Sequence, residues 1–536
     1  MYIIKITSCL WRWTVNKELY ENGIKGTAKI KLSGLLRIFL VALLVLLQLF
    51  IMFFFTYWLR GNYVFLYLVV ELISMILGIF LINVYRNSSY KIAWLCIFLI
   101  FPITGHIMFL LWGNRYSKKK MERTITKNIT QNSSIYLKQD ENIRNKFQIK
   151  KPNQNNISIY LENHQFPLFK NNIIEYYSFG EDVFKAIFED IKKAEKFILL
   201  KFYIVAQGIL YDTLFDLLTQ KVKEGVEVKF MCDDFGASLR TPKDFKKNFE
   251  DNGIEVAVFN PIHRYTDRLY LNYRSHQKIV VVDGDIAYTG GINLADEYAN
   301  LIDRFGVWKD TAVRLKGDAA WGFTVIFFQM WELCGKTQKI DYNKYRSSKE
   351  FEENDVFCHV ISDGPANNPE NPIESLYRQI IYNAKEYLYI TTPYLVIEDD
   401  LKESLVTAAK SGIDVRVITP YIPDKKNVKL LTEYNYGPLL EGGVKILEYK
   451  PGFIHSKMII NEKCGIVGTI NMDYRSFYLH YECGLFMCDK DIINRIYDDF
   501  IATMEVCIEV DYEEWKNRSW YLKSYQYVLN LFSTLI

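Results

Sequence analysis

Several features that often reveal a function are scarce in this chain of 536 residues. Its nine cysteines are scattered without a C-x-x-C pair, so we expect reduced thiols and no zinc site. The net charge of only +3 gives no sign of a nucleic-acid partner. No small-residue cleavage site follows the first hydrophobic run, so we expect no removable signal peptide. Only seven histidines are present, so a histidine that recurs in a pattern carries weight.

Apolar residues are concentrated in three runs near the N-terminus, at residues 38–59, 63–84 and 92–112. Each run is long enough to span the hydrocarbon core of a bilayer. We therefore expect a basic N-terminal segment over residues 1–37, followed by a transmembrane anchor of two to three helices over residues 38–112. The third run contains Pro102, which makes it the candidate for a re-entrant segment.

The stretch NRYSKKKMERTITK after the third run is rich in Lys and Arg. Positive residues beside a membrane segment favour its cytoplasmic side. The sequence therefore predicts a multi-pass protein of the cell membrane whose large C-terminal part lies in the cytoplasm.

Beyond the hydrophobic runs, residues 113–159 are rich in Lys, Asn and Gln and predict a polar linker. From about residue 160, strand-like runs alternate with helical ones, which predicts an α/β fold of mixed sheets flanked by helices. SGIDVRVITP (411–420) then echoes EGVEVKFMCD (224–233), and EGGVKILEY (441–449) echoes DNGIEVAVF (251–259). We predict a duplicated domain, with a first half over residues 160–350 and a second half over residues 351–536 that ends in a C-terminal helix.

Each half has a histidine and a lysine two residues apart, directly before an apolar strand. The first copy, HQKIVVVDG, starts with His276 and Lys278, and the second, HSKMIINEK, starts with His455 and Lys457. Side chains two apart in a strand point to the same side, so each pair presents its imidazole and its amine together. Both copies continue to a turn with candidate phosphate-binding residues, which are Gly290, Gly291 and Asn293 in the first half and Asn471 in the second.

Two such half-sites facing each other suit phosphodiester chemistry. Lysines and asparagines around the phosphate offset the charge that grows in the transition state. One imidazole attacks phosphorus and forms a phosphohistidine, while the other protonates the leaving alcohol. We assign His276 as the nucleophile and His455 as the acid and base, although the internal symmetry permits the reverse. Each imidazole needs an acidic partner on its other nitrogen, for which Asp310 and Glu482 are the candidates, and no metal or cofactor is required.

The first copy resembles the H-x-K-x(4)-D motif of the phospholipase D superfamily, in which a second copy is a hallmark. Within it, the chain resembles bacterial cardiolipin synthases through YRSHQKIVVVDGDIAYTGGINLADEY, LLEGGVKILEYKPGFIHSK and NMDYRSFYLHYE. By this resemblance, the acids that end the two motifs, Asp283 and Glu462, belong with the catalytic motifs, where their expected role is to support the structure of the site. Glu462 stands where the family has aspartate, which we expect to alter packing rather than abolish the chemistry.

The resemblance implies two phospholipase D-type domains behind a helical membrane region. It also implies that two phosphatidylglycerol molecules are joined into cardiolipin with release of glycerol, so phosphatidylglycerol and membrane lipids are the expected partners. Two alternatives stay open, a membrane-anchored phosphodiesterase of the same fold and a non-catalytic membrane scaffold. The sequence leaves open the oligomeric state and whether the C-terminal segment SWYLKSYQYVLNLFSTLI packs on its own domain or lies on the bilayer.

Overall fold

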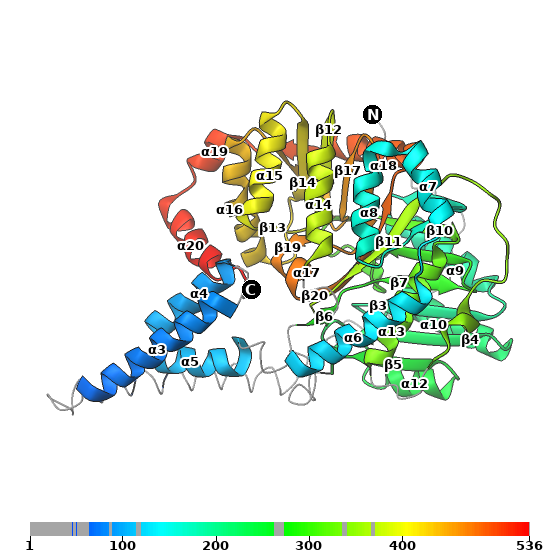
Figure 1. Ribbon diagram of the computed structural model, residues 1–536, viewed down its shortest axis with the longest axis horizontal. Coiled ribbons are helices and arrows are strands. Elements are labelled where there is room, and N and C mark those ends of the chain that lie inside the picture. Colours follow the sequence, from blue (N-terminus) through cyan, green and yellow to red (C-terminus); the bar gives the residue numbers. More distant parts are fainter. Residues whose placement is uncertain are drawn as a thin grey trace.

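In the computed structural model the chain forms two mixed β-sheets with helices on both faces (Figure 1). The expected α/β class and the duplication are both present. The residues that the structure describes are 46, 50, 64–84, 88–113, 119–238, 240–261, 273–334, 340–365 and 370–534.

The sheet of the first half has seven strands in the order β2-β10-β8-β7-β3-β4-β5. Their bounds are β2 Asn172–Tyr177, β3 Phe197–Phe202, β4 Glu227–Asp233, β5 Glu255–Phe259, β7 Ile279–Val282, β8 Ile286–Gly290 and β10 Ala312–Gly317. Strands β3, β4 and β5 pair in parallel, and the other pairs are antiparallel.

The sheet of the second half repeats this topology in the order β11-β20-β18-β17-β12-β14-β15, again with three parallel strands at one end. Their bounds are β11 Cys358–Asp363, β12 Tyr387–Thr391, β14 Asp414–Pro420, β15 Lys445–Tyr449, β17 Met458–Asn461, β18 Gly465–Gly468 and β20 His480–Met487. Strands β1 (Leu168–Phe169) and β21 (Cys507–Glu509) extend its two edges. The repeat that the sequence predicted is therefore a repeat of strand order and direction.

Side chains along the central strands point alternately to the two faces of each sheet, which divides the interior into layers. In β3, Ile198 and Leu200 pack under outer helices, whereas Leu199 points to the opposite face, toward the second sheet. The outer helices are α9 (Gly180–Lys192), α10 (Ile209–Lys223) and α12 (Phe245–Asp251) on the first sheet, and α14 (Pro372–Asn383), α15 (Asp399–Lys410) and α16 (Lys426–Glu441) on the second.

The core between the two sheets also contains α13 (Ala320–Leu333) and α18 (Lys490–Met504). Helix α13, with the sequence AWGFTVIFFQMWEL, is apolar around its whole circumference, and every residue from Ala320 to Trp331 is buried. A helix of this composition is stable only when it is enclosed, so the two halves share one interior.

The prediction that residues 113–159 form a polar linker was wrong for most of that segment. It is helical in α6 (Lys119–Tyr136) and α7 (Glu141–Lys150) and leads into α8 (Asn155–Asn163). Ile125 and Ile129, one turn apart on α6, enter the core shared by the two halves, and Ile157 and Leu161 on α8 enter the core of the second half. A few apolar residues at helical spacing were enough to dock a largely polar segment.

The hydrophobic N-terminal part contains α3 (Val64–Val84), α4 (Ser88–Ile100), α5 (Pro102–Met108) and a π-helical turn at Phe109–Gly113. The expected third span, residues 92–112, is interrupted at Pro102, and α5 packs against α4. No helix among the described residues combines the length and the apolar content that crossing a bilayer requires. The basic segment 1–37 and, apart from Leu46 and Phe50, the first expected span 38–59 lie outside the described residues.

The C-terminal segment forms α19 (Tyr512–Lys516) and α20 (Trp520–Leu531). Helix α20 packs on α16 of its own domain, where the Gln526 amide donates to the carbonyl of Leu430 at 3.1 Å, and it also contacts α4 (Figure 1). Its other side stays exposed, with Trp520 at 77% and Tyr521 at 67% of their full exposure. The C-terminal helix therefore packs on its own domain, and its exposed aromatic side is the part that a bilayer could contact.

Candidate active site

Short strands that cross between the halves position the two histidines. Strand β6 (Arg274–Ser275) of the first half pairs in parallel with the start of β20, and the His276 backbone N–H donates to the Tyr481 carbonyl at 2.9 Å. Strand β16 (Gly452–Ile454) of the second half pairs in parallel with β9 (Val307–Lys309) of the first, and the His455 N–H donates to the Lys309 carbonyl at 2.7 Å. Each histidine therefore follows a strand that is hydrogen-bonded to the other half.

This pairing exchanges the acidic partners between the halves. Continuing the register of β6 and β20 brings His276 beside Glu482, whose two carboxylate oxygens each lie 3.0 Å from His276 Nδ1. The matching register of β16 and β9 brings His455 beside Asp310, with Nδ1 2.6 Å from Oδ2. An Nδ1–H that donates to a carboxylate leaves the Nε2 lone pair free to react.

The two acids are supported differently. Gly291 follows β8, and a Cβ at this position would lie only 2.0 Å from Asp310 Oδ1, so the glycine makes room for that carboxylate. Thr469, which follows β18 at the equivalent place, donates its hydroxyl to Glu482. Glu482 therefore accepts a hydrogen bond from a side-chain hydroxyl, whereas Asp310 accepts one from the backbone N–H of Thr311 at 2.9 Å.

The protonation of the site reflects its burial. Burial lowers the pKa of His276 to about 3 and the pKa of His455 well below its usual value, so both imidazoles are neutral near pH 7. Burial raises the pKa of Asp310 to about 7, against the opposing charge of Lys457. Burial alone would also raise the pKa of Glu482, but His276 and His480 hold it below the usual range.

The lysines lie directly behind the histidines. Lys278 Nζ donates to the His276 carbonyl at 2.5 Å, and Lys457 Nζ lies 2.7 Å from His455 Nδ1. Both amines are buried, and burial lowers the pKa of Lys278 to about 7 and that of Lys457 to about 8. A bound phosphate would restore their positive charge, because an anion nearby favours the protonated amine.

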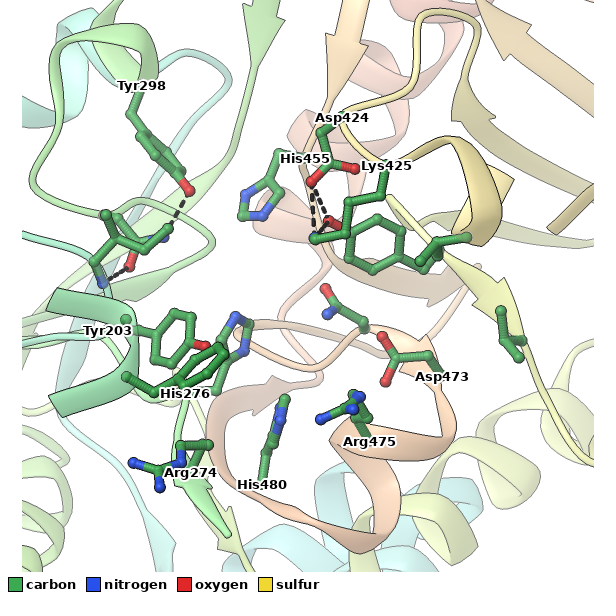
Figure 2. A pocket seen from close by; sticks show the side chains of 18 of the residues that line it. Tyr203, Arg274, His276, Tyr298, Asp424, Lys425, His455, Asp473, Arg475 and His480 are labelled. Atoms are coloured by element: carbon green, nitrogen blue, oxygen red, sulfur yellow. Dashed lines mark hydrogen bonds and ion pairs between the residues drawn. The ribbon is translucent and has the colours of Figure 1, made fainter. Parts of the chain in front are cut away.

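The two asparagines line the same cavity as the histidines. Asn293 accepts from the backbone N–H of Ile204 at 2.9 Å and donates to the Tyr298 hydroxyl at 2.7 Å. The side-chain oxygen of Asn471 is buried and has no hydrogen-bond partner among the described residues. The cavity has a volume of about 640 Å³, and its polar groups face one another across it (Figure 2). Its apolar lining includes Phe235, Phe305, Trp308, Val396, Val428 and Leu431.

Eight of the twelve candidate residues lie outside this lining. Lys278, Lys457, Asp310 and Glu482 are among them, but each contacts one of the two histidines that line the cavity. The other four lie farther from the cavity. Asp283 accepts from the backbone N–H groups of residues 195, 196 and 197 at 2.7–2.9 Å, which joins the turn after β7 to the start of β3. Glu462 occupies the matching place in the second half, where it accepts from residues 385 and 386 at 3.2 and 3.4 Å. Gly290 and Gly291 lie against the strand that follows Asp310, where a Cβ on Gly290 would meet the Thr311 carbonyl at 2.3 Å.

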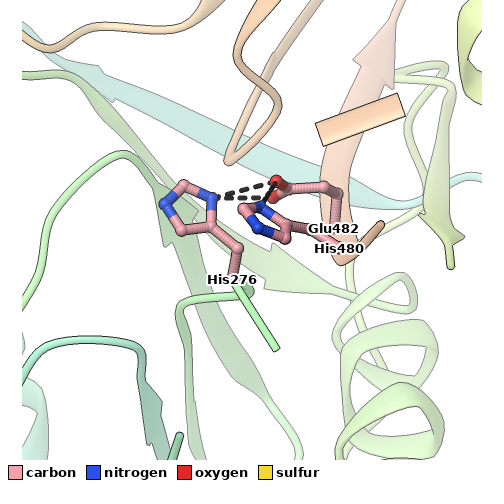
Figure 3. Close-up of side chains that lie close together, drawn as sticks. All are labelled: His276, His480 and Glu482. Atoms are coloured by element: carbon pink, nitrogen blue, oxygen red, sulfur yellow. Dashed lines mark hydrogen bonds and ion pairs between the residues drawn. The ribbon is translucent and has the colours of Figure 1, made fainter. Parts of the chain in front are cut away.

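Sequence reasoning missed the aromatic groups that hold the two imidazoles. Tyr203 meets the His276 ring edge-on at a centroid distance of 5.0 Å, and Tyr298 does the same for His455 at 5.3 Å. The ring centre of His480 lies 5.5 Å from that of His276 (Figures 2 and 3). The ring centre of Trp308 lies 5.4 Å from that of His455. Trp308 and His480 each stand two residues before an orienting acid, so alignment of the two halves was the signal that pointed to them.

Two facing half-sites, each with a neutral histidine, a buried lysine and a carboxylate from the other half, define the phospholipase D class of phosphodiester-processing folds. The family described as "Cardiolipin synthase, PLD-like domain" matches residues 187–312 and 377–504, once in each half. The family described as "Phospholipase_D-nuclease N-terminal" matches residues 72–114.

Similar proteins extend over most of the chain. A cardiolipin synthase of Listeria welshimeri is 33% identical over 84% of this chain and 94% of its own length. One of Alkalihalophilus pseudofirmus is 30% identical over 89% and 95%. An uncharacterized protein of Streptococcus mutans is 38% identical over 80% and 92%. The chain belongs to the cardiolipin synthase family.

A crystal structure of phosphatidylserine synthase from Haemophilus influenzae superposes with a TM-score of 0.56 at 16% identity, covering 70% of this chain and 97% of that one. This likeness shows that the two proteins share a fold.

Proposed function

We propose that this protein is a cardiolipin synthase, which transfers a phosphatidyl group from one phosphatidylglycerol to another and releases glycerol. The observation that carries the proposal is the crossed arrangement of the site. Two histidines on one cavity are each oriented by a carboxylate from the opposite half, and a buried lysine lies beside each. The names of the similar proteins from Listeria and Alkalihalophilus support the choice of lipid.

In the first step, Nε2 of His276 attacks phosphorus and forms the P–N bond while the P–O bond to glycerol breaks. The proton that glycerol needs comes from His455. In the second step, His455 takes the proton of the hydroxyl on the second phosphatidylglycerol, whose oxygen displaces His276 and restores the P–O bond. Lys278, Lys457 and the two asparagines offset the charge of the pentavalent transition state.

The difference between the two acids favours these roles over the reverse ones. Glu482 stays ionised because Thr469, His276 and His480 support its charge, so it holds His276 in its neutral and nucleophilic tautomer. Asp310 has its pKa raised to about 7 by burial, so the pair of Asp310 and His455 holds an additional proton near neutral pH. A pair that gains and loses a proton at neutral pH suits acid and base work.

Transfer to a lipid rather than to water follows from an apolar cavity next to a lipid surface. The apolar lining disfavours bulk water around the phosphohistidine. Helices α3, α4 and α20 leave large apolar side chains exposed on neighbouring elements, and Ser533, just beyond α20, lines the cavity. Tryptophan and tyrosine prefer the membrane interface. We place these helices against the bilayer of the cell membrane, with residues 38–112 as the anchor and the catalytic halves on the cytoplasmic side.

Product analysis tests the proposal. The purified protein in detergent receives phosphatidylglycerol labelled in its phosphate, beside His276→Ala and His455→Ala variants. Wild type is expected to give cardiolipin and free glycerol, and His276→Ala neither of them. His455→Ala is expected to lose turnover while it still accumulates labelled protein slowly at His276. Formation of phosphatidic acid without cardiolipin would show that the protein is a hydrolase rather than a synthase. If no variant accumulates labelled protein, the phosphohistidine intermediate would be refuted.

A further inference from the structure

His276, Glu482 and His480 form a cluster that the transfer mechanism uses only in part (Figure 3). One ligand atom of each lies within 4.8 Å of the other two. His276 Nδ1 is 3.0 Å from the carboxylate, and His480 Nδ1 is 3.6 Å from it, too far for a hydrogen bond. His480 Nδ1 is buried and has no hydrogen-bond partner among the described residues. The cluster therefore contains an imidazole nitrogen that the fold leaves unsatisfied.

Two imidazoles and one carboxylate are a donor set that Zn²⁺ prefers. Bond lengths of about 2.1 Å in a tetrahedral site require donors that lie about 3.4 Å apart. The two distances to Glu482, 3.0 and 3.6 Å, lie on either side of that value, so small side-chain rotations suffice. His276 and His480 both line the cavity, which gives an ion a path of entry and a place for a water as fourth ligand.

The other half-site cannot form such a cluster. Trp308 occupies the place of His480, and an indole nitrogen donates a hydrogen bond but has no lone pair for a metal. Lys457 Nζ also lies 2.7 Å from His455 Nδ1, which places positive charge where an ion would bind. Among the described residues, the cluster around His276 is the one group of three such side chains with this spacing.

We propose that His276, His480 and Glu482 form an inhibitory site for Zn²⁺ or a similar divalent transition-metal ion. The ion takes the lone pair of His276 Nδ1, so the proton that this nitrogen donated to Glu482 moves to Nε2, with no net gain or loss of protons. Nε2 then carries a hydrogen and has no lone pair with which to attack phosphorus. The inhibition rests on the proposed role of His276, whereas the binding of the ion does not.

Metal binding and inhibition are measured on the full chain in detergent after removal of metal by EDTA. Zn²⁺ is titrated by calorimetry, and Co²⁺ serves as a spectroscopic probe through its visible absorption in a tetrahedral site. Wild type is expected to bind one ion per chain, lose cardiolipin formation and regain it with EDTA. His480→Asn, which removes one ligand and keeps a polar side chain, is expected to weaken binding at least about 10-fold and to raise the inhibitory Zn²⁺ concentration by the same factor, relative to its own metal-free rate.

His164→Asn is the matched control, because His164 also lies near a glutamate, 3.7 Å from Glu370, but outside the cavity. It is expected to bind and respond to Zn²⁺ like wild type. His276→Ala, tested for binding alone, is expected to lose the Co²⁺ spectrum. Equal Zn²⁺ affinity and equal inhibition in wild type and His480→Asn would overturn the proposal. If the protein binds the ion through His480 but makes no cardiolipin without metal, the metal site would be confirmed and the proposed function overturned.

Discussion

Substitution of Gly291 by alanine tests whether Asp310 must be held against His455. The new Cβ would lie 2.0 Å from Asp310 Oδ1, whereas real Cβ atoms essentially never approach other atoms closer than 3.0 Å. The carboxylate must therefore retreat by at least about 1 Å, since 3.0 − 2.0 = 1.0. The hydrogen bond to His455, now 2.6 Å, would lengthen to as much as about 3.6 Å, at which it no longer exists.

A displacement of about 1 Å in a catalytic group can cost about 100-fold in rate, which corresponds to about 2.7 kcal/mol in the activation free energy. The assay compares two substrates. Glycerol needs a proton in order to leave phosphatidylglycerol, whereas nitrophenolate leaves a nitrophenyl phosphodiester as an anion. We expect Gly291→Ala to lose about 100-fold with phosphatidylglycerol and much less in the release of nitrophenolate.

Gly442→Ala is the control, because its Cβ would meet Val406 at a similarly short distance of 2.4 Å, away from the cavity. It is expected to lower the melting temperature while leaving the ratio of the two rates unchanged. Equal losses with both substrates in Gly291→Ala would refute the assignment of His455 as the acid. Unchanged turnover of phosphatidylglycerol would refute the need for the contact between Asp310 and His455.

Three further predictions follow from the same geometry. Burial lowers the pKa of Lys278 to about 7 and that of Lys457 to about 8, so kcat/KM is expected to fall as the pH rises above about 7 and the amines lose their charge. A profile that stays flat to pH 10 would contradict this role. Asp283→Ala is expected to lower the free energy of unfolding by about 3 kcal/mol, because three backbone N–H groups lose their acceptor. Glu462→Ala is expected to lower it by about 1 kcal/mol, because its hydrogen bonds are longer. Equal losses of unfolding free energy for the two variants in chemical denaturation would contradict this difference. Replacing the exposed Trp520 and Tyr521 together by serine is expected to reduce binding to anionic vesicles several-fold and to leave turnover in detergent micelles intact, whereas unaltered vesicle binding would exclude α20 from the interface.

Local patterns in the sequence were enough to predict the fold class and the duplication. Short, nearly continuous apolar runs identify β3 and β7 as strands buried on both faces, and the matched glycines 225 and 412 mark the same turn in both halves. The polar composition of residues 113–159 misled the expectation of a linker, because docking of α6 depends on a few isoleucines whose partners come from α13, about 200 residues away. A local pattern cannot reveal a surface that distant residues supply.

The sequence by itself identified the residues that we propose perform the chemistry. His276, Lys278, His455 and Lys457 follow from a motif of three residues and its repetition in the two halves, although the structure places both motifs between strands rather than within them. Tertiary structure alone decided which acid each histidine receives. Asp310 and Glu482 cross to the opposite half because β9 pairs with β16 and β6 with β20, and strand pairing between distant segments depends on how the two sheets pack. The same packing gave Glu482 the hydroxyl of Thr469 and left Asp310 against a glycine, and this difference supports the proposed roles of His276 as nucleophile and His455 as acid.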